Sequence, residues 1–260
     1  PGRIVSSAAK VDAKSLAERK CFLCAANRPA VQEGLAWENY TVLINPFPIF
    51  PRHLTIPCND HTDQLISGRI GDMMSIAALL PEYILFYNGP KCGASAPDHM
   101  HFQAGNKGFM TFDTDLAKGD KTLVKEVEGA KVEYVKGLGR VAFVVSASKK
   151  EAGEALFNEL FAALPQKADE TEAMLNILCW VEGEEWKIAV FPRKQHRPSC
   201  YSAEGDANIL ISPASVDMGG VFITPLEKDF EKITSEDIQM ILDEVCFSEA
   251  DAEQLISTLK

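Results

Sequence analysis

The most constraining feature of this sequence is the run 98–104, Asp-His-Met-His-Phe-Gln-Ala, which follows a loop rich in Gly, Ser and Pro. Alternation of polar and apolar residues over such a run predicts a half-buried strand. Successive side chains of a strand point to opposite faces, so His99, His101 and Gln103 are expected to share one face. The chain therefore needs a sheet with a buried face, and that sheet presents two imidazoles and a carboxamide side by side.

The remainder of the first half predicts further strands and one long helix. Stretches that are β-prone and bounded by turn residues predict strands over 40–45, 53–57 and 83–87. Helical spacing of apolar side chains predicts a helix over 62–80. A polar helical lead-in is expected over 1–20.

The charged stretch 113–139 is expected to be a linker between two halves, 1–112 and 140–260. In the second half, the segment Glu-Gly-Glu-Glu at 182–185 predicts a β-hairpin. The predicted strands cover 141–145, 173–181, 186–191, 207–211 and 221–224, and the predicted helices cover 151–164, 236–246 and 249–259. The expected fold class is α+β, with an antiparallel sheet in each half and helices packed on it.

Composition and charge exclude several classes of protein. The chain has 260 residues, of which 46% are hydrophobic, so it can bury a substantial core. Its formal net charge is −11, whereas proteins that grip nucleic-acid phosphates carry a basic footprint. Without a stretch of about 18 apolar residues, a membrane span is not expected either. Seven cysteines, an odd count, and the polar first twenty residues favour a reduced, cytoplasmic location.

The loop ahead of the alternating run is suited to phosphate. Its residues Asn88, Gly89, Gly93, Ala94 and Ser95 are small or polar, so a phosphate can approach the backbone and meet amide and hydroxyl donors. Taken alone, a His-x-His pair is more often a metal-binding or surface pair than a catalytic one. The adjoining loop and the glutamine that follows shift the balance toward phosphate chemistry.

The sequence contains an Asn-Gly pair at 88–89, a Gly-Ala-Ser turn at 93–95 and a His-x-His-x-Gln segment at 99–103. In this combination it resembles the histidine-triad superfamily. The resemblance is closest to the branch that holds galactose-1-phosphate uridylyltransferase and diadenosine tetraphosphate phosphorylase, and it covers roughly residues 20–105. It implies a HIT-like fold. It also implies that His101 is a nucleophile that attacks the α-phosphorus of a nucleotide and forms a nucleotidyl-histidine.

The same resemblance assigns supporting roles around that nucleophile. Gln103 would hydrogen-bond a phosphoryl oxygen or the leaving group without competing as a base. Ser95 and the loop amides would hold the equatorial oxygens, where charge gathers in the transition state.

A second motif, Cys21-x-x-Cys24, points to a metal. By itself this spacing is ambiguous between zinc binding, redox chemistry and chance. His61 and His99 can complete a tetrahedral set of two thiolates and two imidazoles. The resemblance to the uridylyltransferases implies such a set at these places, with a structural zinc that fixes the strand carrying His101. The alternative is that both cysteines are ordinary small apolar residues, because the related phosphorylases lack the metal.

Four further candidates are weaker. His53 lies in a segment similar to the strand that lines the nucleotide pocket of the superfamily, where it can contact the base or the nucleophile, or simply pack. Lys91 and Arg28 can pair with phosphates, although a solvated charge is the default for each. The cation-rich segment 192–198 resembles the part of the phosphorylases that faces the distal end of the substrate, and His196 within it is equally compatible with a surface role.

Together these features predict an enzyme, a nucleotidyltransferase or nucleotide phosphorylase. It would move a nucleoside monophosphate from a dinucleoside polyphosphate or nucleotide sugar to phosphate or a sugar phosphate. One alternative is a histidine-triad hydrolase, although hydrolytic members usually keep a third histidine where this chain has Gln103. The other is a non-catalytic protein that binds zinc and nucleotide, against which the intact His101 and Ser95 argue. A homodimer is compatible with the superfamily, whose edge strands often pair between chains.

Overall fold

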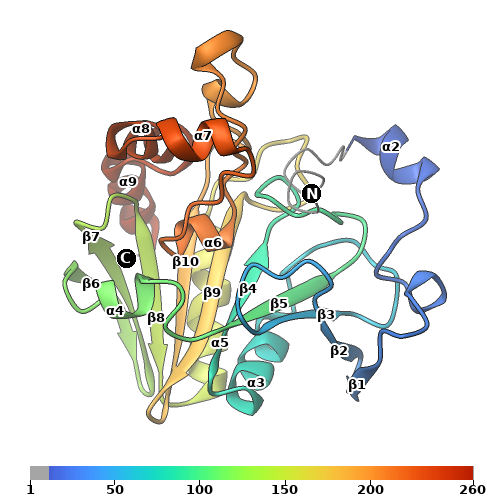
Figure 1. Cartoon of the computed structure of the whole chain (residues 1–260). Coiled ribbons are helices and arrows are strands. Elements are labelled where there is room, and N and C mark those ends of the chain that lie inside the picture. The colour runs from blue at the N-terminus through green and yellow to red at the C-terminus, as the bar shows by residue number, and fades with distance from the viewer. Residues whose placement is uncertain (1–11, 260) are drawn as a thin grey trace.

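The computed structural model describes residues 12–259 and organises them around one large antiparallel sheet. The sheet has ten strands in the order β1-β2-β3-β5-β4-β9-β10-β8-β7-β6 (Figure 1). The strands are β1 (Gly34–Trp37), β2 (Tyr40–Ile44), β3 (His53–Pro57), β4 (Tyr83–Asn88), β5 (His101–Asn106), β6 (Asp120–Val127), β7 (Ala130–Lys136), β8 (Ala142–Ala147), β9 (Leu175–Glu182) and β10 (Glu185–Pro192).

Helices cover the sheet and extend beyond it. The helices are α2 (Ala13–Glu18), α3 (Ile70–Leu79), α4 (Phe112–Asp115), α5 (Lys150–Ala163), α6 (Ser215–Met218), α7 (Glu227–Lys232), α8 (Ser235–Val245) and α9 (Glu249–Leu259). Short 3-10 turns lie at Ala25–Asn27, Ser199–Tyr201 and Gly205–Ala207.

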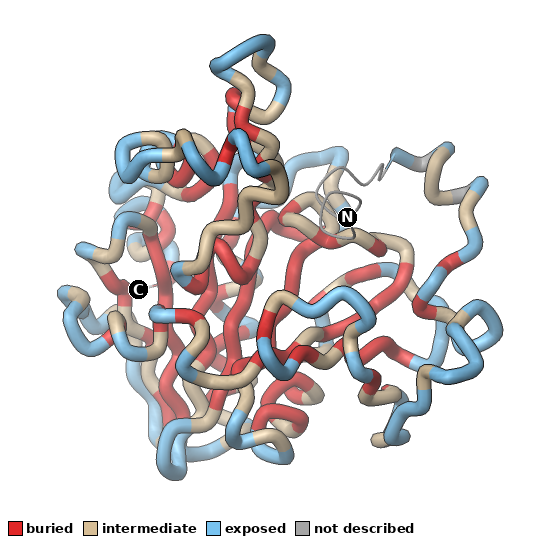
Figure 2. The backbone as a smooth tube through the Cα atoms, in the orientation of Figure 1, coloured by how far each residue is buried: buried red, intermediate tan, exposed pale blue. Residues whose placement is uncertain are grey.

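Apolar side chains from alternate strand positions form separate cores on the two faces of the sheet. In β4, Leu85 and Tyr87 belong to one core, and Ile84 and Phe86 belong to the other, as the two-residue period of a strand requires. Helices α3, α5 and α9 complete the first core, whereas α4, α6 and α8 complete the second. The expected α+β class is confirmed, and the central strands are buried on both faces (Figure 2).

The two halves of the chain meet where β4 pairs with β9. Phe86 lies opposite Leu178 and Asn88 lies opposite Asn176, so the halves share one continuous sheet. The segment 113–139, expected as a linker, contributes β6 and β7 to that sheet. β6 is an edge strand with mostly exposed side chains, which explains why its charge-rich sequence is typical of a solvated connector.

Helix α3 begins later than the periodicity over 62–80 predicts. Ahead of it the chain is irregular, because its backbone N–H groups bond to distant segments. Gln64 N–H donates to Pro97 O at 3.0 Å, and Ile66 N–H donates to Glu172 Oε2 at 2.9 Å. The apolar spacing in this stretch reflects burial against the core and not helical periodicity.

Strand β5 begins at His101, three residues after the predicted start at Asp98. His99 lies in a turn, where its N–H donates to Ala96 O at 3.1 Å. The expectation that His99 shares a strand face with His101 and Gln103 is therefore wrong. Only the last two of the three side chains belong to the strand.

Two stretches of the second half that were expected as strands, 207–211 and 221–224, are largely irregular. Their apolar residues are explained by packing, since Ile209 and Ile211 form a small cluster with Ile241 of α8. Burial of apolar side chains does not require a ladder of backbone hydrogen bonds, which is why the composition alone misled the prediction.

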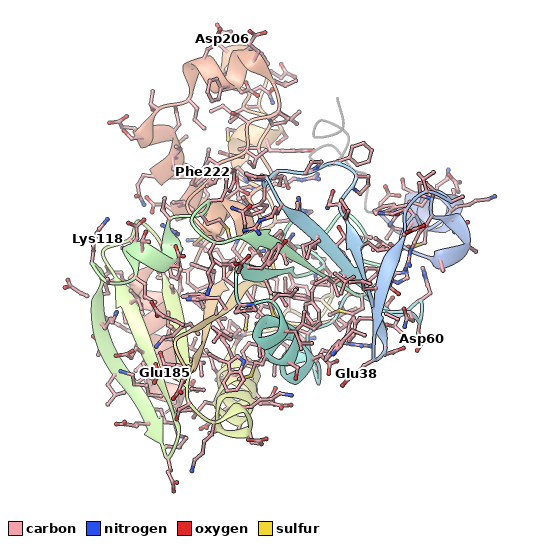
Figure 3. All side chains as sticks on the ribbon, turned by 60° about the horizontal axis from the view of Figure 1, so that its bottom comes forward. Glu38, Asp60, Lys118, Glu185, Asp206 and Phe222 are labelled. Carbon is pink, nitrogen blue, oxygen red and sulfur yellow. The ribbon has the colours of Figure 1, made fainter. Side chains whose placement is uncertain are left out.

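Several charged side chains lie at the periphery of the molecule. Glu38, Asp60, Lys118, Glu185 and Asp206 are all exposed at the ends of elements or in loops (Figure 3). Within residues 12–259, no helix has the length and the apolar character needed to cross a membrane.

Candidate active site and metal centre

His101 opens β5 and is buried, with 4% of its surface exposed. Its Nδ1 lies 2.8 Å from the backbone carbonyl oxygen of His99. A carbonyl oxygen only accepts, so Nδ1 carries the proton and Nε2 carries the lone pair. Burial lowers the pKa of His101 to about 4. The imidazole is thus neutral at physiological pH, in the tautomer that makes Nε2 a nucleophile.

Gln103, two residues further along β5, is oriented by His53 of β3. Ile49 N–H donates to His53 Nδ1 at 3.1 Å, so the proton of this neutral imidazole sits on Nε2. His53 Nε2 in turn lies 3.0 Å from Gln103 Oε1 and donates to it. The His53 ring packs against Phe50 and Phe86. With its oxygen held in this way, Gln103 turns its amide hydrogens away from His53, ready to donate elsewhere.

The loop between β4 and β5 contains the two glycines that were expected to admit a phosphate. Gly93 has a φ of 94°, and a Cβ there would lie 2.5 Å from Ala214 Cβ. A Cβ on Gly89 would lie 2.8 Å from Leu175 O. Neither position accepts a larger residue without movement, because the loop packs directly on segments of the second half.

Asn88, at the end of β4, forms side-chain hydrogen bonds across the junction between the halves. Its Oδ1 accepts the Ser215 N–H at 2.8 Å and the Asn176 Nδ2 at 3.1 Å. The side chain is buried, and the contacts tie the start of the loop to β9 and to the segment before α6. The position of the loop therefore depends on the second half.

The other candidate phosphate ligands occupy varied environments. Ala94 is buried and Ser95 is half-buried within the loop. Lys91 Nζ lies 3.0 Å from Asp169 Oδ2 in a partly exposed ion pair. Arg28 is used locally, since its Nε–H donates to a backbone carbonyl of its own loop at 2.8 Å.

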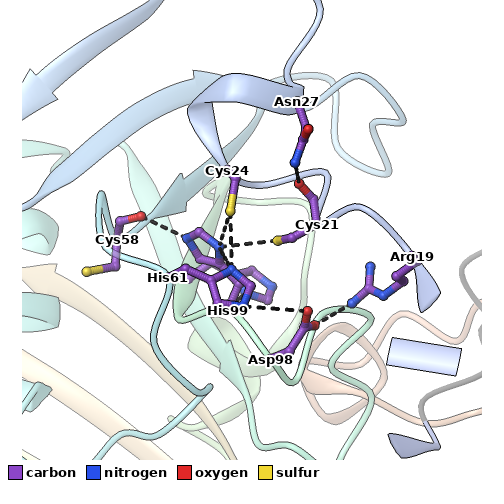
Figure 4. Close-up of polar contacts among 9 residues, drawn as sticks. Arg19, Cys21, Cys24, Asn27, Cys58, His61, Asp98 and His99 are labelled. Carbon is purple, nitrogen blue, oxygen red and sulfur yellow. Dashed lines mark hydrogen bonds and ion pairs between the residues drawn. The ribbon is translucent and has the colours of Figure 1, made fainter. Parts of the chain in front are cut away.

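Four side chains that are distant in sequence meet beside this site. One ligand atom from each of Cys21, Cys24, His61 and His99 lies within 4.8 Å of the others (Figure 4). Nδ1 of His99 lies 3.3 Å from Cys21 Sγ, 3.6 Å from Cys24 Sγ and 3.2 Å from His61 Nδ1. Ligand atoms bound to one tetrahedral zinc ion at about 2.0–2.3 Å are about 3.3–3.8 Å apart. The four predicted ligands are brought together in a set that can hold one such ion.

The surroundings of the cluster orient its histidines. His99 Nε2 lies 2.9 Å from the carbonyl oxygen of Cys58 and donates to it, so Nδ1 faces the thiols. Asp98 Oδ2 lies 4.0 Å from His61 Nε2, and the same carboxylate pairs with Arg19 (Figure 4). Such outer contacts are typical of metal-ligating histidines, whose second nitrogen is held by a carbonyl or a carboxylate.

The thiols of the cluster differ in their ionisation. Burial opposes ionisation of Cys21, but the adjacent His99 and hydrogen bonds from nearby backbone N–H groups lower its pKa to about 6. Burial and the adjacent Cys21 raise the pKa of Cys24. The pKa of the Cys21 thiol thus lies below neutral pH. Two thiols and two imidazoles form the kind of donor set that zinc prefers.

The cation-rich segment 192–198 contains a structural cation, Arg193, and a half-buried histidine, His196. Arg193 is 3% exposed, and its guanidinium donates to Asn176 Oδ1 at 2.6 Å and to four backbone carbonyl oxygens, so it is a structural cation. His196 is half-buried, and burial together with the charges of Arg197, Arg193 and Lys91 lowers its pKa to about 4. These positive charges form a local cationic region on an otherwise acidic protein.

Three buried polar residues were not singled out by the sequence. Gln64 is fully buried ahead of α3, and its backbone oxygen lies 3.1 Å from the hydroxyl of Tyr87, which donates to it. Tyr87 also contacts the carboxyl group of Glu172, whose pKa burial raises to about 7. None of the three belongs to a motif. The only signal is a polar side chain within an apolar stretch, which does not by itself indicate a partner.

Comparison with known proteins gives one curated relative and a set of similar structures. Protein APA1 of Saccharomyces cerevisiae is 23% identical over 221 residues, which cover 76% of this chain. The chain spans 65% of the length of that relative. Residues 1–106 match a family described as a domain of unknown function, DUF4922.

Among solved structures, the chain is similar to yeast Ap4A phosphorylase Apa2, with a TM-score of 0.57 and 20% identity over 80% of this chain and 72% of the other. The same enzyme in complex with Ap4A gives a TM-score of 0.56 at 20% identity, over 80% of this chain and 74% of the other. This likeness confirms the fold that the resemblance to the histidine-triad superfamily implies. Residues 125–259 match the family described as GDPGP1-like, C-terminal domain, and because this match covers more than half of the chain, the protein belongs to that family.

Proposed function

We propose that this protein is a nucleotidyltransferase of the phosphorylase type, in which His101 carries the nucleotide covalently. The observation that supports this most is the tautomer of a buried imidazole, whose Nδ1 is tied to His99 O at 2.8 Å while Nε2 keeps its lone pair. The imidazole lies at the end of a glycine-containing loop suited to phosphate. Transfer through a P–N bond needs a neutral, oriented imidazole next to such a loop.

In the first step, His101 Nε2 attacks the α-phosphorus of the donor nucleotide. The N–P bond forms while the P–O bond to the leaving group breaks, and the leaving group departs with the bonding electrons. In the second step, an oxygen of the acceptor attacks the same phosphorus, and the N–P electrons return to His101 Nε2. The Gln103 amide, the loop N–H groups and the Ser95 hydroxyl stabilise the charge on the phosphoryl oxygens.

The donor we propose is a dinucleoside polyphosphate or a nucleotide sugar, and the acceptor is phosphate or a sugar phosphate. The likeness to a protein titled Ap4A phosphorylase supports the first kind of donor. Lys91 and Arg197, whose positive charges both act on His196, support a substrate with several phosphates, because positive charge beside the loop attracts them. No feature of the described site favours water as the acceptor.

We also propose that Cys21, Cys24, His61 and His99 bind one zinc ion, which would serve as a structural cross-link. Support comes from the chemistry of the donor set and from the distances between its atoms. His99 links the two sites, because its imidazole belongs to the cluster while its carbonyl oxygen accepts the Nδ1 proton of His101. Fixing His99 therefore also fixes the tautomer and the direction of the nucleophile.

The test is incubation with a dinucleoside polyphosphate or a nucleotide sugar that carries a label in the α-phosphate. We expect label on the protein in a bond that is labile to acid and stable to alkali, as a phosphoramidate is. His101→Asn should abolish the label and lower turnover by several orders of magnitude, whereas the control Glu184→Gln, at an exposed residue of the β9–β10 hairpin, should keep it. Turnover by the wild type without any covalent intermediate would overturn the proposal, and product formed equally without phosphate would identify a hydrolase.

A further inference from the structure

Strands β4 and β5 separate at the point where the candidate nucleophile begins. They pair regularly from Tyr83 opposite Asn106 to Phe86 opposite Gln103. Continued in the same register, Asn88 would lie opposite His101. Instead β4 stays with β9, and the ladder between β4 and β5 ends.

The carboxamide of Gln64 fills the fork between the two strands. Its Oε1 accepts the His101 N–H at 2.8 Å, and its Nε2 donates to His101 O at 3.0 Å and to Asn88 O at 3.1 Å. Gln64 has no exposed surface. One side chain thus replaces the strand partner that both residues would otherwise supply to each other.

The backbone of Gln64 is anchored as firmly as its side chain. Its N–H donates to Pro97 O at 3.0 Å, near the end of the loop 89–100 between β4 and β5, which we call the proposed phosphate loop. Its oxygen accepts the Tyr87 hydroxyl at 3.1 Å. The residue therefore contacts the end of β4, the end of the loop and the start of β5. These are the three segments that set the distance between the nucleophile and the proposed phosphate loop.

The other neighbour of β5 does not hold the backbone of the nucleophile. His101 lies opposite Pro57 of β3, and proline has no N–H to donate. In an antiparallel strand the N–H and the C=O of one residue point to the same side. For His101 that side is the fork, so both main-chain groups of the nucleophile bond to Gln64.

We infer that Gln64 is a positioning residue for the transfer reaction, which splits β4 from β5 and holds His101 at the correct distance from the proposed phosphate loop. The inference rests on the proposed role of His101 as the nucleophile. Gln64 does not touch the reacting atoms, and its effect passes through the backbone of His101. Displacement of a reacting group by about 1 Å costs up to about a hundredfold in rate, so the loss of this amide should slow the chemical step.

The experiment compares Gln64→Leu, which keeps the size of the side chain without its hydrogen bonds, with the wild type. We expect formation of the nucleotidyl-enzyme to slow by about tenfold to a hundredfold at saturating nucleotide, while the affinity for AMP changes little. The control is Leu255→Ala in α9, a buried position far from the fork, which should lower the melting temperature without slowing the labelling. An equal labelling rate in wild type and Gln64→Leu would overturn the inference.

A second variant, Gln64→Glu, covers the case in which Gln64→Leu does not fold. An ionised carboxylate would face the carbonyl oxygens of Asn88 and His101, whereas a protonated carboxyl group can donate to one of them. Activity relative to the wild type should therefore rise as the pH falls. Taking the ratio at each pH removes the pH dependence that the two proteins share, including the part due to His101, Tyr87 and Glu172 around the fork. A flat ratio would overturn the inference.

A spectroscopic measurement separates this inference from the proposed function. Long-range proton–nitrogen NMR correlations report which nitrogen of His101 carries the proton. Gln64 holds the backbone of His101, and that backbone positions the imidazole against His99 O. We therefore expect a single tautomer, protonated on Nδ1, in the wild type and a mixture in Gln64→Leu. Absence of label in the wild type would overturn the proposed function and with it the catalytic effect of Gln64, whereas an unchanged tautomer in the variant would overturn the positioning role alone.

Discussion

His53 Nε2 donates to Gln103 Oε1 across 3.0 Å, and this one contact decides which way the Gln103 amide faces. The donor role of His53 is fixed in turn by the backbone N–H of Ile49, which occupies Nδ1 at 3.1 Å. This series of hydrogen bonds, from the Ile49 N–H through the His53 imidazole, leaves free the Gln103 amide hydrogens, which in the proposed reaction donate to a phosphoryl oxygen. His53 thus acts on the site through Gln103.

His53→Phe keeps the packing against Phe50 and Phe86 and removes the donor. The Gln103 amide would then be free to turn, so we expect kcat to fall by about tenfold to a hundredfold with little change in KM. A double-mutant cycle checks the cause. In a Gln103→Leu background His53→Phe should have almost no further effect, and a full additional loss there would contradict this mechanism.

The metal cluster gives a prediction that does not depend on catalysis. Protein purified without chelator should contain about one zinc per chain, and Cys24→Ser should lose the metal and melt at a lower temperature. Cys200→Ser, at a buried cysteine outside the cluster, is the matched control and should keep the zinc. Elemental analysis with thermal melts checks both variants. Wild-type protein without metal, whose melting is unaffected by chelator, would contradict the zinc site.

The proposed phosphate loop should not tolerate a side chain at Gly93. A Cβ there would lie 2.5 Å from Ala214 Cβ at a φ of 94°, so Gly93→Ala must displace either the loop or the segment before α6. Gly137→Ala is the matched control, because Gly137 has a φ of 79° with nothing within 4 Å of its Cβ position. Both variants carry backbone strain of about 1 kcal/mol. Only Gly93→Ala should also slow nucleotide transfer, and equal rates in the two variants would show that the loop accommodates the methyl group.

Glu172 should make stability depend on pH. Burial raises its pKa to about 7, whereas an unfolded glutamate titrates near 4.3. Between these values the folded state binds more protons than the unfolded state, so the free energy of unfolding falls as pH rises through this window. The contribution is about 1.4 kcal/mol per pKa unit, or about 4 kcal/mol in all. It is present at acid pH and lost near neutrality.

Glu172→Gln mimics the protonated carboxyl group and can still meet Tyr87 and the Ile66 N–H. Relative to the wild type, the variant should gain stability progressively from about pH 4.5 to pH 7, as the linkage requires. Denaturant unfolding at several pH values measures the difference. The exposed hairpin residue Glu184 supplies a control, Glu184→Gln, for which the difference should stay flat. A flat difference for Glu172→Gln as well would show that its carboxylate is stabilised in the fold.

Local patterns predicted many elements of the fold. The strand expected over 53–57 is β3, His53–Pro57, because its alternation and its bounding prolines are local signals. The helix expected over 249–259 is α9, Glu249–Leu259, because the N-cap at Ser248 is also a local signal. The meeting of Cys21, Cys24, His61 and His99 was also predicted, since the order and type of these residues carried the information.

Features that depend on distant contacts could not be predicted in this way. In the sequence, Gln64 lies in a stretch with the apolar spacing of an amphipathic helix. Its hydrogen bonds to Asn88, Pro97 and His101 hold it instead in an irregular segment. His99 continues the alternation of the strand, yet its backbone turns before β5 begins. Asn176 and Ser215 gain their importance only from the junction with Asn88. In each case the deciding hydrogen bond joins residues that no periodicity relates.

Because β4 completes its hydrogen bonding only against β9, the chain cannot be cut into two independent modules. A fragment that ended before the second half would leave β4 as a bare edge, and such edges recruit strands from other molecules. During synthesis this edge stays open until β9 has emerged, so the late part of the chain protects the early part from aggregation. The second half thus covers an aggregation-prone edge of the first half and also completes the sheet.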